Sequence, residues 1–361
     1  MMISICIITK NESNKIKKCL ENVSKLGYEI VVVDTGSTDD TRNIALQYTD
    51  KVYDFEWVDD FSAARNFCAS KASNDFIFVI DSDEYLIEFD KKYIQNKLLK
   101  NPQCLGSIKR NEKAPFYGEN IAELQISYAD RIYNKNKYHY VGYVHEQIKP
   151  INPLLKNVEA SDCVDLPVTV EHDGYMQTPE QKKHKAKRYV DLLEKQLRDE
   201  NINKYIQKEY TMYQIGKSYV YGGDFVRGYA YLKATLDYDL EPRTPWVLDL
   251  IITYMQVLVE LRQYDEALQL YGVYDAFDYS ADFVFYMGYI HYLIGDYENA
   301  ISEYKKATKF ENSIVKGRNS YLALYNIGVI YEGLGDMENA KAYYKKALPY
   351  TMAKESLEQI K

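Results

Sequence analysis

The first 86 residues alternate between fully apolar runs and segments with helical spacing. The runs "MISICIIT", "EIVVVDTG", "KVYDF" and "DFIFVID" predict four strands, because short apolar stretches between polar segments are typical of buried strands. The stretches between them, such as "ESNKIKKCLENVSKLG", predict helices. Strands that are apolar on both faces and separated by helices indicate a parallel sheet covered on both sides.

The second half has a different pattern, an internal repeat. The segments "FYMGYIHYLIGDYENAISEYKKA" (285–307) and "LYNIGVIYEGLGDMENAKAYYKKA" (324–347) align position by position, with Gly288 matching Gly328. An earlier copy is "YQIGKSYVYGGDFVRGYAYLKAT", and a degenerate one runs through "LVELRQYDEALQLY". This pattern resembles the tetratricopeptide repeat, in which small residues let two helices approach and aromatic residues fill the groove. We expect "ENSIVKGRNS" to lengthen the turn between the last two copies.

These two patterns predict two domains, as the length of 361 residues also favours. Residues 87–175 are less regular, with strand-like pieces near "SIKRN", "LQISYADRIYN" and "VTVEHDGY". We therefore expect an α/β domain over residues 1–178. An all-helical domain of tetratricopeptide-like repeats is expected over residues 179–361.

Composition excludes several classes of protein. The net charge is −8 and no basic tract occurs, which disfavours binding to nucleic acid or to an anionic membrane. No apolar stretch approaches the roughly 20 residues that span a bilayer, and no basic segment precedes the N-terminal apolar run as in a secretory signal. Scattered, odd-numbered cysteines fit reduced thiols: Cys6, Cys19, Cys68, Cys104 and Cys163. We expect a cytoplasmic protein.

Polar clusters follow the first, second and fourth predicted strands, at residues 9–12, 34–37 and 81–83. Ligands of open parallel sheets bind beyond the carboxyl ends of the strands. The glycine-rich signatures that cradle phosphates are absent, so a bound diphosphate needs another counter-charge. A Mg²⁺ or Mn²⁺ ion held by Asp83, with Asp81 nearby, would supply it. Two acids at the end of a strand are weak evidence alone, since a strand that leaves the core often continues with polar residues.

The order of four segments strengthens the hypothesis. "CIITKNESNKIKKCL", "VVVDTGSTDDT", "WVDDFSAARN" and "VIDSDE" together resemble the N-terminal half of glycosyltransferase family 2, whose members are inverting enzymes of the GT-A fold with a Rossmann-like sheet. The resemblance covers residues 1–175. It implies that Asp34 contacts the nucleobase or ribose, and that Asp81 and Asp83 bind a metal and the sugar-nucleotide. The donor-binding residues it implies are Thr9, Asn11, Glu12, Asp34, Ser37, Arg65, Asn66, Asp81, Ser82 and Arg131.

Some of these residues also have simpler interpretations. Arg65 and Asn66 would mean little on a helix that faces solvent, and Arg131 has the same two readings. Near a donor, Arg65 could pair with an acid or a phosphate.

Two later segments resemble a bacterial subgroup of this family. "RIYNKNKYHYVGYVHEQI" is similar to its R-x-F…G-x-V-H-E segment, with Tyr133 at the aromatic position, and "VTVEHDGY" is similar to its histidine segment. The subgroup includes enzymes joined to tetratricopeptide repeats, such as sublancin-type peptide S-glycosyltransferases. By this resemblance His172 completes the metal site, although a lone histidine is more often a packed or surface residue.

Glu146 is our candidate for the general base, because transfer to a hydroxyl needs a group on the acceptor side to take its proton. His145 is adjacent, and in an extended segment the two would point to opposite faces. Which of them is the base stays open, and Glu146 could instead form a structural salt bridge.

The sequence thus predicts a metal-dependent, inverting glycosyltransferase. The expected donor is a UDP-sugar such as UDP-glucose or UDP-N-acetylglucosamine, and the expected acceptor is a peptide or protein side chain. The repeats would dock this acceptor or form a homodimer. Alternatives are transfer to a cell-surface glycan, an inactive repeat scaffold, and a nucleotidyltransferase, which is disfavoured because "ITKNES" lacks a glycine-rich loop. The sequence does not identify the sugar, because pocket shape selects it.

Overall fold

The structure is a computed structural model and describes residues 3–115, 122–152, 163–172 and 178–360. The chain divides into two compact units. The first comprises residues 1–114 and 126–215, and the second comprises residues 115–125 and 216–361. The predicted domain boundary at 178/179 coincides with the start of a helix at Pro179, whereas the first unit extends to Ile215. The boundary therefore stays a prediction.

The four predicted strands form one side of an eight-stranded sheet. They are β1 (Ile3–Thr9), β2 (Glu29–Asp34), β3 (Val52–Asp54) and β4 (Phe76–Val79), and they pair in parallel in the order β3-β2-β1-β4. The predicted parallel sheet is confirmed for these strands.

The other half of the sheet is mixed, which the sequence did not predict. It continues as β7 (Ala122–Asn134), β6 (Leu105–Pro115), β10 (Cys163–His172) and β5 (Glu84–Phe89). Strand β7 is antiparallel to β4, and β10 is parallel to β6 but antiparallel to β5. The acids after β4 thus lead through a short turn into another strand at the far edge of the sheet.

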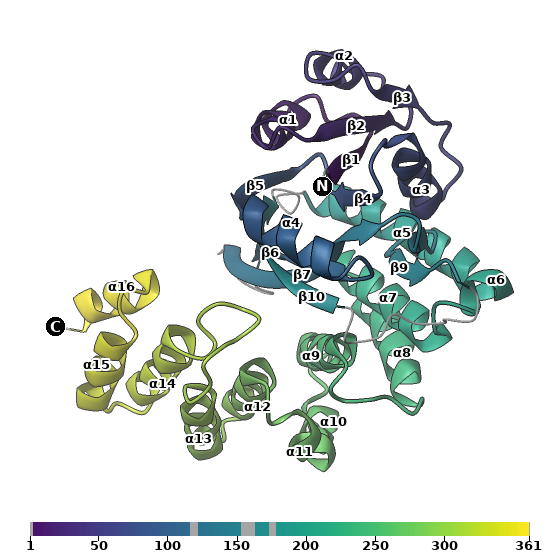
Figure 1. The fold of residues 1–361 in the computed structure, drawn as a ribbon. Helices are drawn as coiled ribbons and strands as arrows, with labels where there is room; N and C mark the ends of the chain where they lie inside the picture. The colour runs from purple at the N-terminus through teal and green to yellow at the C-terminus, as the bar shows by residue number, and fades with distance from the viewer. Residues whose placement is uncertain (1–2, 116–121, 153–162, 173–177, 361) are drawn as a thin grey trace. The chain divides into compact units, whose positions relative to one another are not determined.

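Helices cover both faces of the parallel strands (Figure 1). The apolar residues of α1 (Ile16–Ser24), α2 (Thr41–Ala45) and α4 (Lys91–Lys100) pack with Ile3, Ile5 and Ile7 of β1. Helix α3 (Phe61–Lys71) packs on the opposite face, against Cys6 and its neighbours. Alternate residues of one strand therefore serve two cores, as period-two side-chain geometry requires.

Further elements of the first unit border the ends of the sheet. A two-stranded antiparallel sheet comprises β8 (Tyr138–Val141) and β9 (Gln147–Pro150). Helices α5 (Pro179–Arg198), α6 (Glu200–Asn203) and the first part of α7 (Lys208–Tyr221) follow. Helix α5 begins with a capping box, in which Thr178 and Gln181 satisfy each other's backbone N–H groups.

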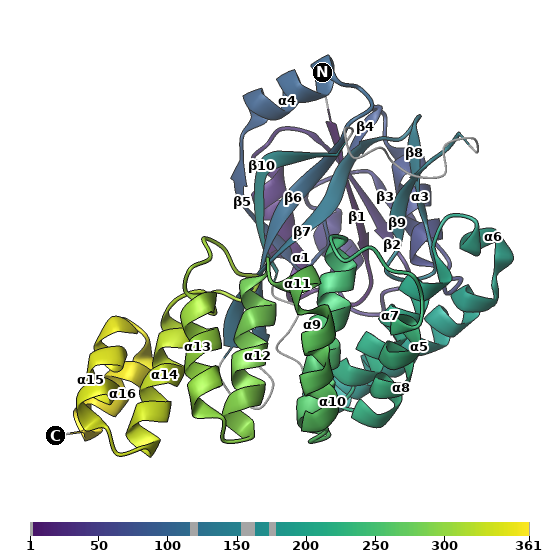
Figure 2. The same ribbon diagram turned by 90° about the horizontal axis from the view of Figure 1, so that it is seen from below.

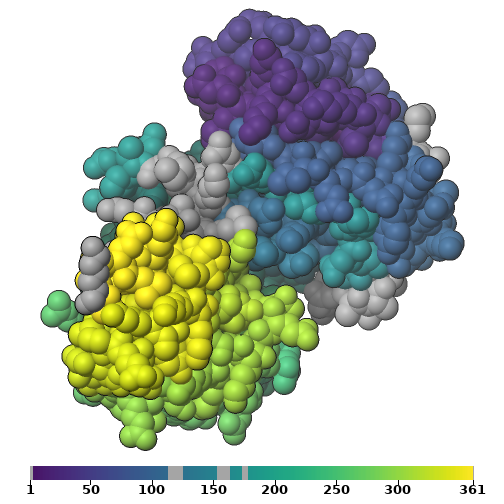
Figure 3. Space-filling view, turned by 90° about the vertical axis from the view of Figure 1, so that its left-hand side faces the viewer, coloured from purple at the N-terminus to yellow at the C-terminus, as the bar shows by residue number. Residues whose placement is uncertain are grey.

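The second unit consists mainly of antiparallel helix pairs, shown from below in Figure 2. Helices α12 and α13, and α14 and α15, pack as pairs and correspond to the two aligned repeats. The C-terminal helices form one continuous surface, coloured yellow in Figure 3. The helices of this unit after α7 are α8 (Phe225–Leu236), α9 (Pro245–Glu260), α10 (Tyr264–Leu268), the 3-10 helix η2 (Gln269–Val273), α11 (Tyr274–Phe277), α12 (Ala281–Leu293), α13 (Tyr297–Ala307), α14 (Tyr321–Gly333), α15 (Met337–Lys346) and α16 (Thr351–Gln359).

The segment "ENSIVKGRNS" connects α13 to α14 and is held by one buried acid. Asp282 of α12 accepts hydrogen bonds from the backbone of Ile314 (2.7 Å) and Val315 (3.1 Å) and from Nη1 of Arg318 (2.9 Å). The longer turn that the sequence predicted is confirmed, and it is tied to the repeat before it. Within the described residues, no helix has both the length and the apolar character needed to cross a membrane.

The repeat glycines lie where helices approach closely, as the repeat pattern predicted. A Cβ atom on Gly288 would lie 3.1 Å from the ring of Tyr304, and one on Gly328 would lie 2.6 Å from the ring of Tyr344. Both tyrosines are fully buried. A methyl group at either glycine would therefore push against a ring that has no space to move into.

Two glycines of α14 provide a matched test of this close packing. Replacing Gly328 with Ala should destabilise the protein by about 1–3 kcal/mol, the usual cost of overpacking a core. Replacing Gly333 with Ala should leave stability unchanged or raise it by up to about 1 kcal/mol, because that Cβ meets no atom within 4 Å and Ala favours helix. Calorimetric unfolding of the full chain measures both. Equal effects of the two substitutions would contradict the packing argument.

Candidate active site

A pocket of about 1280 Å³ opens in the first unit, at the carboxyl ends of β1 and β4 and the C-terminal end of β10. Its lining comes from segments far apart in the sequence. Eleven of the residues that the sequence predicted for the site line it: Thr9, Asn11, Glu12, Arg65, Asp81, Ser82, Asp83, Arg131, His145, Glu146 and His172. Three others do not: Asp34, Ser37 and Asn66.

Asp34 and Thr9 lie on adjacent strands at paired positions. One carboxylate oxygen of Asp34 accepts hydrogen bonds from the backbone of Gly36 (2.8 Å) and Ser37 (2.6 Å). Its other oxygen, Oδ2, is buried and has no partner among the described residues, and the hydroxyl of Thr9 is in the same situation. Buried polar atoms are almost always satisfied, so these two oxygens are able to accept a hydrogen bond from a polar group that reaches them.

Asn11 and Ser37 connect the loops that follow β1 and β2. The backbone N–H of Asn11 donates to Oγ of Ser37 (2.9 Å), and the side-chain oxygen of Asn11 accepts from the backbone of Thr38 (2.8 Å). Asn11 has a φ of 55°, a conformation that asparagine tolerates better than most residues. The contacts of Ser37 are thus structural, whereas Asn11 also borders the pocket.

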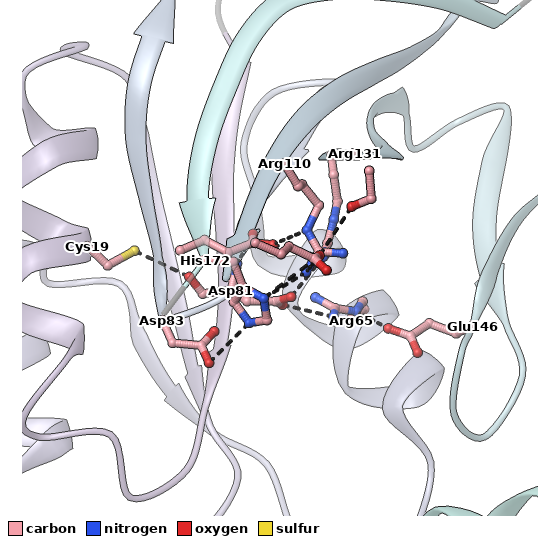
Figure 4. Close-up of polar contacts among 11 residues, drawn as sticks. Cys19, Arg65, Asp81, Asp83, Arg110, Arg131, Glu146 and His172 are labelled. Atoms are coloured by element: carbon pink, nitrogen blue, oxygen red, sulfur yellow. Dashed lines mark hydrogen bonds and ion pairs between the residues drawn. The ribbon is translucent and has the colours of Figure 1, made fainter. Parts of the chain in front are cut away.

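Asp81 lies between two arginines that come from different elements (Figure 4). Its Oδ1 accepts from Nη2 of Arg65 on α3 (2.9 Å), and its Oδ2 accepts from Nη2 of Arg131 on β7 (2.8 Å). Burial alone would raise the pKa of Asp81, but Arg131 and Arg65 outweigh it and hold this pKa well below its usual value. Both oxygens of Asp81 are thus already engaged by arginines, which would compete with a cation for this carboxylate.

Arg65 also binds Glu146. Nε of Arg65 donates to Oε1 of Glu146, and both side chains are about nine-tenths buried. Glu146 therefore does form a salt bridge, and its partner is Arg65. Within the described part of the chain, Oε2 of Glu146 has no hydrogen bond, which leaves that oxygen able to accept a proton from a bound acceptor.

The segment that carries His145 and Glu146 is not extended. The expectation that the two side chains point to opposite faces required an extended segment and therefore does not apply. His145 has a φ of 51°, in the left-handed region, and lies in a bend between β8 and β9. Its ring meets the edge of Tyr189 of α5 at a centroid distance of 5.4 Å. A non-glycine residue in this conformation costs free energy, so the surrounding packing fixes the turn that presents Glu146.

Asp83 forms a pair with His172 beside the contacts of Asp81. Nε2 of His172 lies 3.4 Å from Oδ2 of Asp83, and Nη2 of Arg110 lies 3.3 Å from Nδ1 of the same ring. Because arginine only donates, Nδ1 of the neutral ring accepts and Nε2 carries the proton that faces Asp83. Burial alone would lower the pKa of His172, but the hydrogen bond with Asp83 raises it above its ordinary value.

This pair can accommodate a divalent cation if one proton moves. For Nε2 to bind a metal, the ring proton must shift to Nδ1, which would displace Arg110 from that nitrogen and turn the N–H towards Glu112, whose Oε1 lies 3.9 Å away. Among the residues that the structure describes, no three His, Cys, Asp or Glu side chains are grouped to hold a metal by themselves. A cation at Asp83 and His172 would therefore need donor phosphates and water, which is how Mg²⁺ is usually bound.

Several residues that line the pocket were not predicted from the sequence. On α5, His184, Lys185, Arg188 and Tyr189 line the pocket. Their spacing of one, four and five positions places them on one helix face, but a face that meets water has the same spacing. Burial lowers the pKa of Lys185.

Two other residues of the site, Arg110 and Tyr140, also went unpredicted, because nothing in a single sequence marks them. Both line the pocket, from β6 and β8 respectively. Arg110 pairs with Glu84 (2.9 Å).

The Asp81 contacts predict a pH-dependent loss of stability on replacing Asp81 with Asn. At pH 7 the variant should lose about 3 kcal/mol, the low end of the cost of breaking a buried ion pair, because 26% of the side-chain surface is exposed. A carboxylate with a depressed folded pKa stabilises above its unfolded pKa of about 3.9 and loses this effect in acid. The difference from the parent chain should therefore be constant from about pH 8 to 5 and shrink below about pH 4.

Calorimetric unfolding across this pH range measures the difference. Asp54→Asn is the control, because the Arg42–Asp54 pair is exposed and its loss should cost less than about 1 kcal/mol. A difference that grows towards acid pH would contradict the arginine pairing of Asp81.

Three sequence profiles match the chain. Glycosyl transferase family 2 matches residues 4–147, and two tetratricopeptide-repeat profiles match residues 256–314 and 321–348. The solved structure of MamA resembles part of the chain with a TM-score of 0.38 and 20% identity, covering 51% of this chain and 99% of MamA.

Curated relatives match as well. A TPR repeat-containing protein of Synechococcus elongatus is 28% identical over 73% of this chain, and the SPbeta prophage-derived glycosyltransferase SunS of Bacillus subtilis is 33% identical over 55%. The chain spans 62% and 45% of the length of these two proteins. An uncharacterized glycosyltransferase of Rickettsia conorii is 30% identical over 45% of this chain and 70% of its own length. The chain therefore belongs to glycosyltransferase family 2 and carries tetratricopeptide repeats after its glycosyltransferase region.

Proposed function

We propose that the protein is an inverting glycosyltransferase that uses a divalent cation and a UDP-sugar. The observation that carries the proposal is the position of Arg65, which pairs with Asp81 after β4 and with Glu146 on the β8–β9 loop. The first contact lies beside the Asp83–His172 pair, and the second holds the candidate base. One residue thus joins a donor side and an acceptor side of a single pocket.

On the donor side, the unpartnered oxygens of Asp34 and Thr9 would bind the nucleoside, since a hydroxyl or ring N–H can satisfy an acceptor that is already buried. Asp83 and His172 would hold Mn²⁺ or Mg²⁺ next to the diphosphate. When bound, the cation neutralises the charge that develops on the leaving nucleoside diphosphate. Lys15, 3.8 Å from Asp83, and Lys185 also face this region and add positive charge to it.

On the acceptor side, Glu146 would remove the proton from the attacking group. The acceptor oxygen forms a bond to the anomeric carbon as the bond from that carbon to the diphosphate oxygen breaks, which inverts the configuration. The acceptor proton passes to the free oxygen of Glu146, and the electron pair leaves with the diphosphate. Arg65 keeps Glu146 in place while this happens.

The acceptor is proposed to be a peptide or protein side chain, because helical repeats offer extended surfaces for such partners. Transfer to a cell-surface glycan remains the alternative. Docking of the acceptor on the repeats and assembly as a homodimer are further proposals. An inactive scaffold is disfavoured, because Asp81, Asp83, Glu146 and His172 all line one pocket.

The cation is tested by removing Asp83. Titration of UDP in the presence of Mn²⁺ should show affinity reduced by more than about tenfold in Asp83→Ala, because one of only two protein ligands is lost. Asp50→Ala, an exposed acid outside the pocket, is the control and should bind like the parent chain. Unchanged UDP affinity and unchanged donor hydrolysis in excess chelator would contradict the role of the cation. Lys15 and Lys185 would then have to neutralise the charge of the diphosphate.

Substitution of Glu146 separates the base from the metal ligands. Glu146→Gln keeps an oxygen that can accept from Arg65 but removes the base, so single-turnover cleavage of the UDP-sugar should slow by about 10²–10⁴-fold. UDP affinity with Mn²⁺ should barely change. His172→Ala should instead weaken Mn²⁺-dependent UDP binding, with partial recovery at higher Mn²⁺. If the two variants show the opposite pattern, our assignment of the two residues is reversed.

A further inference from the structure

Two neighbouring side chains of the pocket each carry a buried polar atom without a partner. Nη1 of Arg65 and the hydroxyl of Tyr140 are both buried without a hydrogen bond among the described residues. The two residues are 7% and 4% exposed, and both line the pocket. The centre of the Tyr140 ring is 5.5 Å from Cζ of Arg65. Unsatisfied buried groups are costly, and two beside one cavity indicate a ligand that satisfies them.

Both groups are held firmly by their surroundings. Arg65 is fixed by Asp81 on one side and Glu146 on the other (Figure 4). Tyr140 is fixed through its backbone, because Asn66 accepts from its N–H (2.9 Å) and donates to its carbonyl (2.8 Å). Asn66 does not line the pocket itself, but it positions Tyr140, which does. This rigidity keeps the two unpartnered groups in place before a ligand arrives.

The charges nearby favour a neutral, hydroxyl-rich group. The single positive charge of Arg65 already faces two carboxylates, those of Asp81 and Glu146, so little attraction remains for another anion. Burial raises the pKa of Tyr140 to about 12, so its hydroxyl keeps its proton and can both donate and accept. Arg65 contributes a donor only. Sugar hydroxyls match this pair of groups.

The position also fits the transferred sugar, because Arg65 touches both the acid beside the donor site and the candidate base. The group that passes from diphosphate to acceptor must lie between these two. We propose that Nη1 of Arg65 and the hydroxyl of Tyr140 bind hydroxyls of the transferred hexose, which makes Tyr140 a residue that determines sugar specificity. This inference rests on the proposed function.

The test compares UDP with UDP-glucose and UDP-N-acetylglucosamine by titration calorimetry in Mn²⁺, using the full chain and Tyr140→Phe. Loss of the hydroxyl should weaken binding of the sugar-nucleotide that the parent chain prefers by about three- to tenfold, the worth of one hydrogen bond. Binding of UDP alone should not change. Thermal stability should be unchanged or higher, because a hydroxyl without a partner is removed from the interior.

Tyr133→Phe is the matched control. Tyr133 packs edge-on against Tyr140 with ring centroids 5.6 Å apart, and its buried hydroxyl also lacks a partner, but it does not line the pocket. It should leave all three affinities unchanged.

Each other outcome overturns the inference. Equal weakening of UDP and of the sugar-nucleotide by Tyr140→Phe, no weakening of either, or the same effect from Tyr133→Phe would overturn the sugar site and leave the proposed donor class intact. If the parent chain binds neither UDP nor a UDP-sugar, the proposed donor falls and the sugar site with it.

Discussion

The first unit depends on the pairing of Asp81 with Arg65 and Arg131. These contacts join three separate parts of the fold: the end of β4, helix α3 and strand β7. Through Arg65 they extend to Glu146 on the β8–β9 loop, and through Glu84, which pairs with both Arg131 and Arg110, they reach β6. Charges removed from water in this way stabilise a structure only when every partner is in place. The network therefore fixes the distance between the two sides of the pocket.

These contacts give Asp81 and Asp83, the acids after β4, different surroundings. The sequence treated Asp81 and Asp83 as a metal-binding pair, yet the two point to different partners. Asp81 orients arginines, whereas Asp83 faces His172 and Lys15. An arginine fixed by Asp81 can thus orient Glu146 while Asp83 keeps a separate set of contacts.

Much of the fold was predictable because its signals are local. Fully apolar runs marked β1 to β4, and the Gly288 and Gly328 positions marked the close approaches of the repeat helices. Strand β5 and helix α4 were missed, because the acids at 81–84 were interpreted as metal-binding or loop residues after a strand and not as the start of another strand. Glu84 is fully buried and already belongs to the strand, a burial that only the distant Arg110 and Arg131 make tolerable.

The sequence brought most of the predicted site residues to one pocket but did not predict their contacts. Motif order identified Arg65, Glu146 and His172, all of which border one pocket. Nothing in the sequence could show that Arg65 joins Asp81 to Glu146, since the three lie up to 81 positions apart. Helix α5 illustrates a different limit, because a lysine-rich helix face has the same pattern whether it meets water or borders a pocket. Only the folded chain distinguishes these cases.

The most direct test of this account is a crystal structure with UDP-glucose and Mn²⁺, using Glu146→Gln to slow turnover. We expect the nucleoside at Asp34 and Thr9, the cation at Asp83 and His172, and Asp81 still paired with Arg65 and Arg131. A cation bound by Asp81 with either arginine released would contradict the account, as would a nucleotide bound outside this pocket.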